Sequence, residues 1–103
     1  MLNNNQVVSI TKNSNGFVEV DVHAVSDWDG FDKLIAFLKN EYSVIVIEQF
    51  DGPDARRWIL ESEGIKLELL HDDPYGNTIV SVSLASNEKV KEIGNDLKER
   101  LSD

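Results

Sequence analysis

Alternation of apolar and polar residues, which places one face of a strand against a core and the other in water, marks several short segments of the chain. It is clearest over residues 17–23, where three valines alternate with Glu19, Asp21 and His23. A turn containing Asn and Gly at residues 12–16 separates this segment from residues 6–11, so we predict a β-hairpin. The polar face of its second strand is mostly acidic.

Two segments instead repeat apolar residues every three or four positions, as amphipathic helices do. The first begins near Asp27, after a Ser26 that can cap its first turn, and ends at residues 40–42. The second begins near Ser86 and runs to the end of the chain. Gly94 lies inside this second helix, where it either permits a close approach to a sheet or marks a weak point.

Four further strands are predicted between the two helices. The β-branched run from Val44 to Ile47 favours a strand buried on both faces, which we place at the centre of the sheet. Strands over residues 56–61 and 65–70 follow, separated by turns at 51–54 and 61–64. After a turn at 71–77, the last strand occupies residues 78–85, with Val80, Val82 and Leu84 facing inward.

The predicted order is therefore β-β-α-β-β-β-β-α. A chain of 103 residues is the usual size of one domain, so we expect a single α+β domain over residues 1–103. An antiparallel sheet of about six strands with both helices packed on one face is the simplest arrangement of these elements. The beginning of the sequence lacks the features of a signal peptide and no segment resembles a membrane span, so we expect a cytoplasmic protein that does not bind membranes.

The chain carries 19 acidic and 10 basic residues, a net charge of −9. This charge repels phosphate backbones, so we expect no nucleic-acid partner and favour another protein, one that is basic. Between Lys12 and Lys33 all the charged residues other than a histidine are acidic. If the second strand and the start of the first helix lie side by side, we expect them to form a partner-binding surface made of Glu19, Asp21, Asp27, Trp28, Asp29 and Asp32. The alternative is a solvated surface that serves only solubility.

No arrangement of residues predicts catalysis. Ser81 or Ser83 with His71 and Asp72 contains the types of a nucleophile, a base and an acid, but nothing in the sequence resembles a strained turn that presents a nucleophile. The chain also has no cysteine and no glycine-rich phosphate loop. We therefore predict a protein that is not an enzyme and has no cofactor.

The two histidines and their neighbouring aspartates match no metal-binding spacing, so we predict no metal site. A second function nevertheless stays open, in which a pocket between sheet and helices binds a small molecule or a metal with His71, Asp72 and Asp73 at its mouth. A third alternative is a homodimer whose interface contains apolar residues on polar strand faces, such as Ile79 or Leu70. Arg56 and Arg57 are expected to pair with the aspartates of the 51–54 turn.

Three stretches carry a resemblance to a known group of proteins: residues 51–58 (DGPDARRW), 64–69 (GIKLEL) and 72–77 (DDPYGN). Together they resemble small uncharacterised bacterial proteins, some of which are similar to the immunity proteins of toxin systems. The resemblance implies a tight protein complex in which an acidic surface blocks a basic toxin, often a nuclease. It assigns no role to individual residues.

Overall fold

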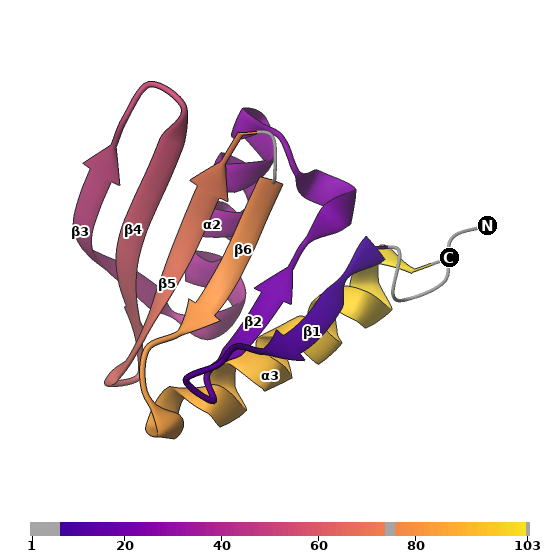
Figure 1. Cartoon of the computed structure of the whole chain (residues 1–103), viewed down its shortest axis with the longest axis vertical. Coiled ribbons are helices and arrows are strands. Elements are labelled where there is room, and N and C mark those ends of the chain that lie inside the picture. Colours follow the sequence, from indigo (N-terminus) through magenta and orange to yellow (C-terminus); the bar gives the residue numbers. More distant parts are fainter. Residues whose placement is uncertain (1–6, 74–75, 103) are drawn as a thin grey trace.

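The computed structural model describes residues 7–73 and 76–102 and contains one six-stranded sheet with two α-helices (Figure 1). The strands are β1 (Ser9–Lys12), β2 (Val18–Asp21), β3 (Val44–Asp51), β4 (Ala55–Ser62), β5 (Ile65–Asp72) and β6 (Gly76–Ser81). The helices are the short 3-10 helix η1 (His23–Val25) and the α-helices α2 (Trp28–Tyr42) and α3 (Leu84–Leu101). The predicted α+β fold and the predicted order of its elements are confirmed. Residue 6 of the predicted first strand and residues 74–75 of a predicted turn lie outside the described residues.

The strands lie in the order β1-β2-β6-β5-β4-β3, and all neighbouring pairs are antiparallel. From β2 the chain crosses the sheet through α2 and enters β3 at the far edge, then returns strand by strand to β6 beside β2. Both α-helices lie behind the sheet in Figure 1, which leaves the face toward the viewer open. No helix among the described residues is long and apolar enough to cross a membrane.

The core lies between the helices and the covered face of the sheet. It is built from alternate residues of the strands and the apolar stripes of α2 and α3, and its largest fully buried side chains include Phe31, Leu38, Leu60, Leu67, Leu69, Ile79 and Ile93. A Cβ atom on Gly94 would lie 2.8 Å from Val20 Cγ2 and 2.9 Å from Ile10 Cδ1. This glycine therefore permits α3 to approach the sheet closely, the first of its two predicted roles.

Strand β3 differs from its prediction, because it forms an edge of the sheet rather than its centre. Val44 is buried, but Ile45 and Ile47 are 56% and 43% exposed. A β-bulge between Val46 and Glu48 inserts an extra residue, so the alternation of faces is interrupted within the apolar run. The β-branched run from Val44 to Ile47 therefore belongs to an edge strand that is not buried on both faces.

The inward face of β6 was also predicted wrongly. Ile79 is fully buried between Asn77 and Ser81, whereas Val80 lies on the open face. The buried face of this strand carries two polar residues, which hid the period of two from a hydrophobicity pattern. The strand ends at Ser81 and α3 begins at Leu84, two residues before its predicted start, with Ser83 as the capping residue.

Candidate functional site

Four of the six predicted partner-binding residues lie together at the start of α2. Asp27 precedes the helix and caps it, since its Oδ1 accepts a hydrogen bond of 2.6 Å from the backbone N–H of Gly30. This is the role predicted for Ser26, which instead ends η1. Trp28 and Asp29 are exposed in the first turn, where a carboxylate suits the positive end of the helix dipole. Asp32, one turn further on, is also exposed.

Glu19 and Asp21 lie elsewhere, on the open face of the sheet. They alternate in β2 with Val18 and Val20, which are buried against the helices on the covered face. The Asp21 carboxylate accepts a hydrogen bond from the Thr78 hydroxyl (2.8 Å), a residue of the neighbouring strand β6. The expected surface of six residues is thus divided by the sheet, because the period of two turns the acidic residues of β2 away from the helix.

The Trp28 ring is exposed, yet it also contacts the side chains of His71 and Arg56. Its side chain is 40% exposed. The His71 ring packs against it edge to face, with 5.3 Å between ring centroids and 83° between ring planes. The Arg56 guanidinium lies 4.8 Å from the Trp28 centroid. An exposed tryptophan with so little remaining freedom resembles the aromatic anchors that dominate binding energy in protein interfaces.

Arg56 joins the start of α2 to the sheet. Only 9% exposed, its guanidinium lies over Phe31 and Trp58 as well as Trp28, at 4.2 Å and 4.8 Å from their centroids. It pairs with Asp32 (3.0 Å) and with Asp51 (3.2 Å). The pairing with Asp51 was predicted, whereas the pairing with Asp32 of the helix was not.

Asp51 is the second carboxylate that accepts from Arg56. It also accepts a hydrogen bond of 2.8 Å from the indole N–H of Trp58. That bond, followed by Arg56, holds the pKa of Asp51 below its usual value. The carboxylate is therefore ionised at neutral pH and shares the single positive charge of Arg56 with Asp32.

Asn77 fastens β6 to the segment that precedes α2. It is 2% exposed, and its Nδ2 donates hydrogen bonds to the backbone oxygens of Val25 (2.6 Å) and Asp27 (3.0 Å). Its Oδ1 lies 2.8 Å from Nδ1 of His71. Asn77 therefore binds both the His71 ring, which packs against Trp28, and the backbone that leads into α2.

Two further aspartates complete an acidic end of the molecule: Asp54, which was not predicted as a site residue, and Asp73, which was predicted only at the mouth of a small-molecule or metal pocket. Asp54 follows β3 and Asp73 follows β5, and the backbone N–H of Asp73 donates to the carbonyl oxygen of Asp54 (3.1 Å). We call Asp27, Asp29, Asp54 and Asp73, together with Trp28, the acidic end. None of its four carboxylates forms an ion pair with a described residue. Acidic turns were visible in the sequence, but their adjacency depends on the pairing of β4 with β5.

A small hollow of about 260 Å³ opens at the acidic end. We call it the Trp28 hollow, and it is lined by Ser26, Asp27, Trp28, Pro53, Asp54, His71 and Asp73. His71 and Asp73 thus line one hollow, as the second predicted function requires. The hollow lies between the start of α2 and the turns of the sheet, however, and Asp72 is not part of its lining.

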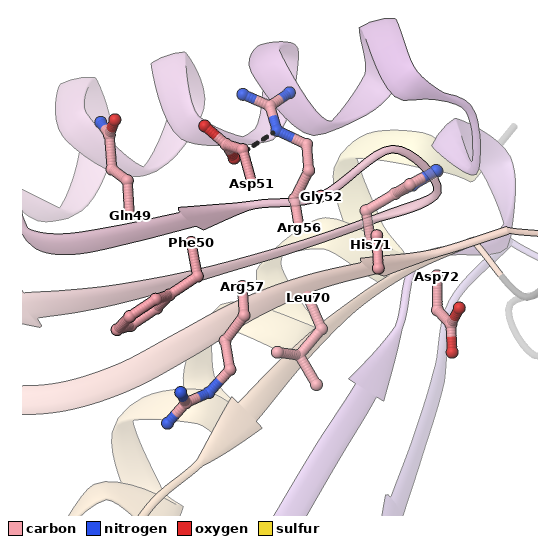
Figure 2. A pocket seen from close by; sticks show the side chains of 10 residues that line it. Gln49, Phe50, Asp51, Gly52, Arg56, Arg57, Leu70, His71 and Asp72 are labelled. Atoms are coloured by element: carbon pink, nitrogen blue, oxygen red, sulfur yellow. Dashed lines mark hydrogen bonds and ion pairs between the residues drawn. The ribbon is translucent and has the colours of Figure 1, made fainter.

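A larger, shallow hollow of about 660 Å³ lies against the end of β3, the start of β4 and the end of β5. Figure 2 shows Phe50, Arg57, Leu70 and Asp72 on one side of the strands, and Arg56 and His71 on the side toward the helix. Arg57 is held by two bonds to Glu68, rather than by the turn aspartates as predicted. Of the two residues predicted for a homodimer interface, Leu70 lies half-buried on the open face. Ile79 is fully buried, so it cannot contribute to such an interface.

The candidate catalytic residues Ser81, Ser83 and His71 are bonded to other partners. The Ser81 hydroxyl bonds to Ser86 and to the backbone of Ser83, while His71 bonds to Asn77. Within residues 7–73 and 76–102, no group of three or more His, Asp or Glu side chains could hold a metal ion.

Comparisons of the chain with models of known protein families, with curated proteins and with solved structures found no match.

Proposed function

We propose that this protein is a non-enzymatic protein-binding module that acts in the cytoplasm and binds a basic partner through its acidic end. The net charge of −9 supports this proposal, because it steers positively charged proteins toward the molecule and repels nucleic acids. Part of this charge lies at the acidic end, where four carboxylates form no ion pair with a described residue.

The proposal rests above all on Trp28. An exposed tryptophan normally loses side-chain freedom on binding, which lowers affinity. Here His71 and Arg56 already fix the ring, so little further ordering is required. A fixed aromatic ring surrounded by carboxylates combines an anchor with a charged rim, the arrangement found at the energetic centre of many interfaces.

We further propose that the partner is a toxin and that this protein is its immunity-type inhibitor. The resemblance of residues 51–58, 64–69 and 72–77 to such proteins supports this, and two of these stretches contribute Asp54 and Asp73 to the acidic end. An acidic inhibitor would occupy the basic surface with which a nuclease holds its substrate.

The test is to capture the partner from native lysate at low salt, release it at high salt, and measure its association rate with variants. The triple variant Asp29→Asn, Asp54→Asn and Asp73→Asn should reduce the association rate about tenfold and flatten its salt dependence. The matched control is Glu88→Gln, Glu92→Gln and Glu99→Gln on α3, which changes the net charge equally and should have a much smaller effect.

A third variant, Glu19→Gln with Asp21→Asn, examines the open face in the same way. It should leave the association rate close to that of the unaltered protein. Equal rates for the acidic-end variant and the unaltered protein would rule out the acidic end as the contact surface. A loss confined to the Glu19 and Asp21 variant would move the contact to the open face.

A small-molecule-binding function is the second candidate, because the 660 Å³ hollow falls within the range of about 300–1,000 Å³ that is usual for ligand sites. Phe50, Leu70 and the paired Arg57 would provide an apolar wall with one charged group. A compound that raises the melting temperature of the unaltered protein but not of Leu70→Asp would favour this candidate.

A further inference from the structure

The Trp28 hollow is small for a metabolite. Its volume of about 260 Å³ lies below the range of about 300–1,000 Å³ for small-molecule sites. A space of this size, open at the surface beside an anchored aromatic ring, suits one side chain of a protein partner. The chemistry of its lining decides which side chain.

His71 presents a hydrogen-bond acceptor to this hollow. Because Nδ2 of Asn77 donates to two backbone oxygens, Oδ1 of Asn77 must accept, and Nδ1 of His71 must carry the proton. In the neutral imidazole Nε2 then holds a lone pair. No described residue bonds to Nε2, which is accessible and not one of the buried polar atoms, and Figure 2 shows the ring extending toward the turn between β3 and β4.

The carboxylates of the lining are acceptors too. Asp27, Asp54 and Asp73 line the hollow, and none of them is neutralised by an ion pair with a described residue. Arg56 contacts the Trp28 ring, but its guanidinium is held by Asp32 and Asp51 and lies over the rings of Phe31 and Trp58. A ligand for this hollow must therefore bring hydrogen-bond donors and positive charge.

We propose that the Trp28 hollow binds one arginine side chain of the protein partner. A guanidinium carries five N–H donors and no acceptor, which matches carboxylates and a lone pair around it. It is also planar, so it can stack on the exposed part of Trp28 while its edges meet Asp54, Asp73 and Nε2 of His71. Lysine would supply charge without this fork and without stacking. The inference rests on the proposed function, since it names the group that the partner contributes.

The test uses three short peptides with blocked ends that differ at one position, which holds arginine, lysine or citrulline, and that contain no other charged residue. Each is titrated into the full-length ¹⁵N-labelled protein at neutral pH, and signals from the Trp28 indole N–H and the His71 ring nitrogens are followed. The arginine peptide should shift both residues in a saturable way. We expect the lysine peptide to bind several-fold more weakly, and citrulline, which keeps the shape without the charge, to give no saturable shift.

Variants then locate the site. Asp54→Asn with Asp73→Asn should weaken binding of the arginine peptide about fivefold to tenfold, because charge-assisted hydrogen bonds become neutral ones. Glu88→Gln with Glu99→Gln removes the same charge from α3 and should leave the affinity unchanged within about twofold. Both pairs replace exposed groups, so the fold should be kept, which the ¹⁵N spectrum reports directly.

Three outcomes would overturn the inference: no shift at Trp28 and His71, equal binding of the arginine and lysine peptides, or equal weakening by both variant pairs. These failures differ from failure of the proposed function. If the acidic-end variant slows association with the protein partner while the arginine peptide does not bind, the binding surface stands and the arginine site falls. If the arginine peptide binds but the acidic-end variant associates with the partner at the unaltered rate, the arginine site stands and the proposed contact surface falls.

Discussion

Arg56 shows how one residue supports the acidic end from below. Its guanidinium contacts rings from α2 and β4, and its two ion pairs reach Asp32 in the helix and Asp51 in β3. Without it, Trp28 would lose a contact on one side and the space among the aromatic rings would be left unfilled. The arginine therefore both stabilises the fold and fixes the anchor residue.

Replacing Arg56 by Ala should lower the free energy of unfolding by about 2 kcal/mol, since the cation–π contacts of a buried guanidinium and its two ion pairs with exposed carboxylates are lost together. The measurement is urea unfolding followed by circular dichroism. Arg57→Ala is the matched control: the side chain is 51% exposed and paired with Glu68, and its loss should cost less than about 1 kcal/mol. Equal losses at the two neighbouring arginines would show that burial of Arg56 contributes nothing.

Local sequence patterns could indicate only part of this site. The acidic start of α2 and the pairing of Arg56 with Asp51 follow from residues close together in the chain. The pairing of Arg56 with Asp32 and the hydrogen bond between His71 and Asn77 depend on which elements become neighbours in the fold. Asn77 was counted as part of a turn, because an isolated buried amide leaves no periodic signal.

At the scale of elements, α3 is fitted to the sheet at one glycine. Gly94 faces Val20, whose branched side chain is fully buried and has little freedom to move. Alanine ordinarily stabilises a helix by about 1 kcal/mol relative to glycine. Here its Cβ would collide with the sheet, so the two effects oppose each other.

We expect Gly94→Ala to lower the free energy of unfolding by about 1 kcal/mol, because overpacking a core typically costs about 1–3 kcal/mol and outweighs the gain in helix propensity. Asn95→Ala, at the next and exposed position, isolates propensity and should raise stability by about 0.5 kcal/mol. The cost at Gly94 should shrink in an Ile10→Val background, which lacks the Cδ1 atom 2.9 Å from the new Cβ. Chemical unfolding of the unaltered protein, the three single variants and the Ile10→Val, Gly94→Ala double variant checks this, and a stability gain at Gly94 would contradict it.

The elements themselves followed well from periodicity, and their places in the sheet did not. The order of strands and helices and the antiparallel pairing were predicted, since each strand is short and joined to the next by a tight turn. The edge position of β3 was not, because a bulge interrupts its alternation and because apolar residues such as Ile45 remain exposed. A hydrophobicity pattern shows that one face of a strand is apolar, but it does not show whether another element of the fold covers that face.

Across the whole molecule, the basic residues that form ion pairs are placed away from the acidic end, apart from Arg56. Arg57 pairs with Glu68 on the open face, Lys89 with Glu63, and Arg100 with Asp96 and Glu41. The acidic end holds four carboxylates that form no ion pair with a described residue, and they lie around the exposed Trp28. Such a distribution opposes folding through repulsion and favours association with a basic protein.

Because the same carboxylates repel one another and favour binding, we predict that removing two of them changes stability and binding in opposite directions. Asp54 and Asp73 are neighbours through a backbone hydrogen bond, and neither forms an ion pair with a described residue. Replacing both by Asn should raise the free energy of unfolding of the isolated protein by about 0.5 kcal/mol, because repulsion between like charges is relieved. Added salt should stabilise the unaltered protein more than this variant, since screening acts on the same repulsion.

Thermal and urea unfolding at several salt concentrations measure both effects, with Glu88→Gln and Glu99→Gln as the variant of equal net charge. A gain confined to the Asp54 and Asp73 variant, together with weaker arginine binding, would mean that the carboxylates destabilise the free protein and contribute to its complex. A loss of stability would instead mean that these aspartates hold their turns in place, as Asp residues often do by bonding to nearby backbone N–H groups. The sign of one change in unfolding free energy therefore separates a surface that serves binding from one that serves folding.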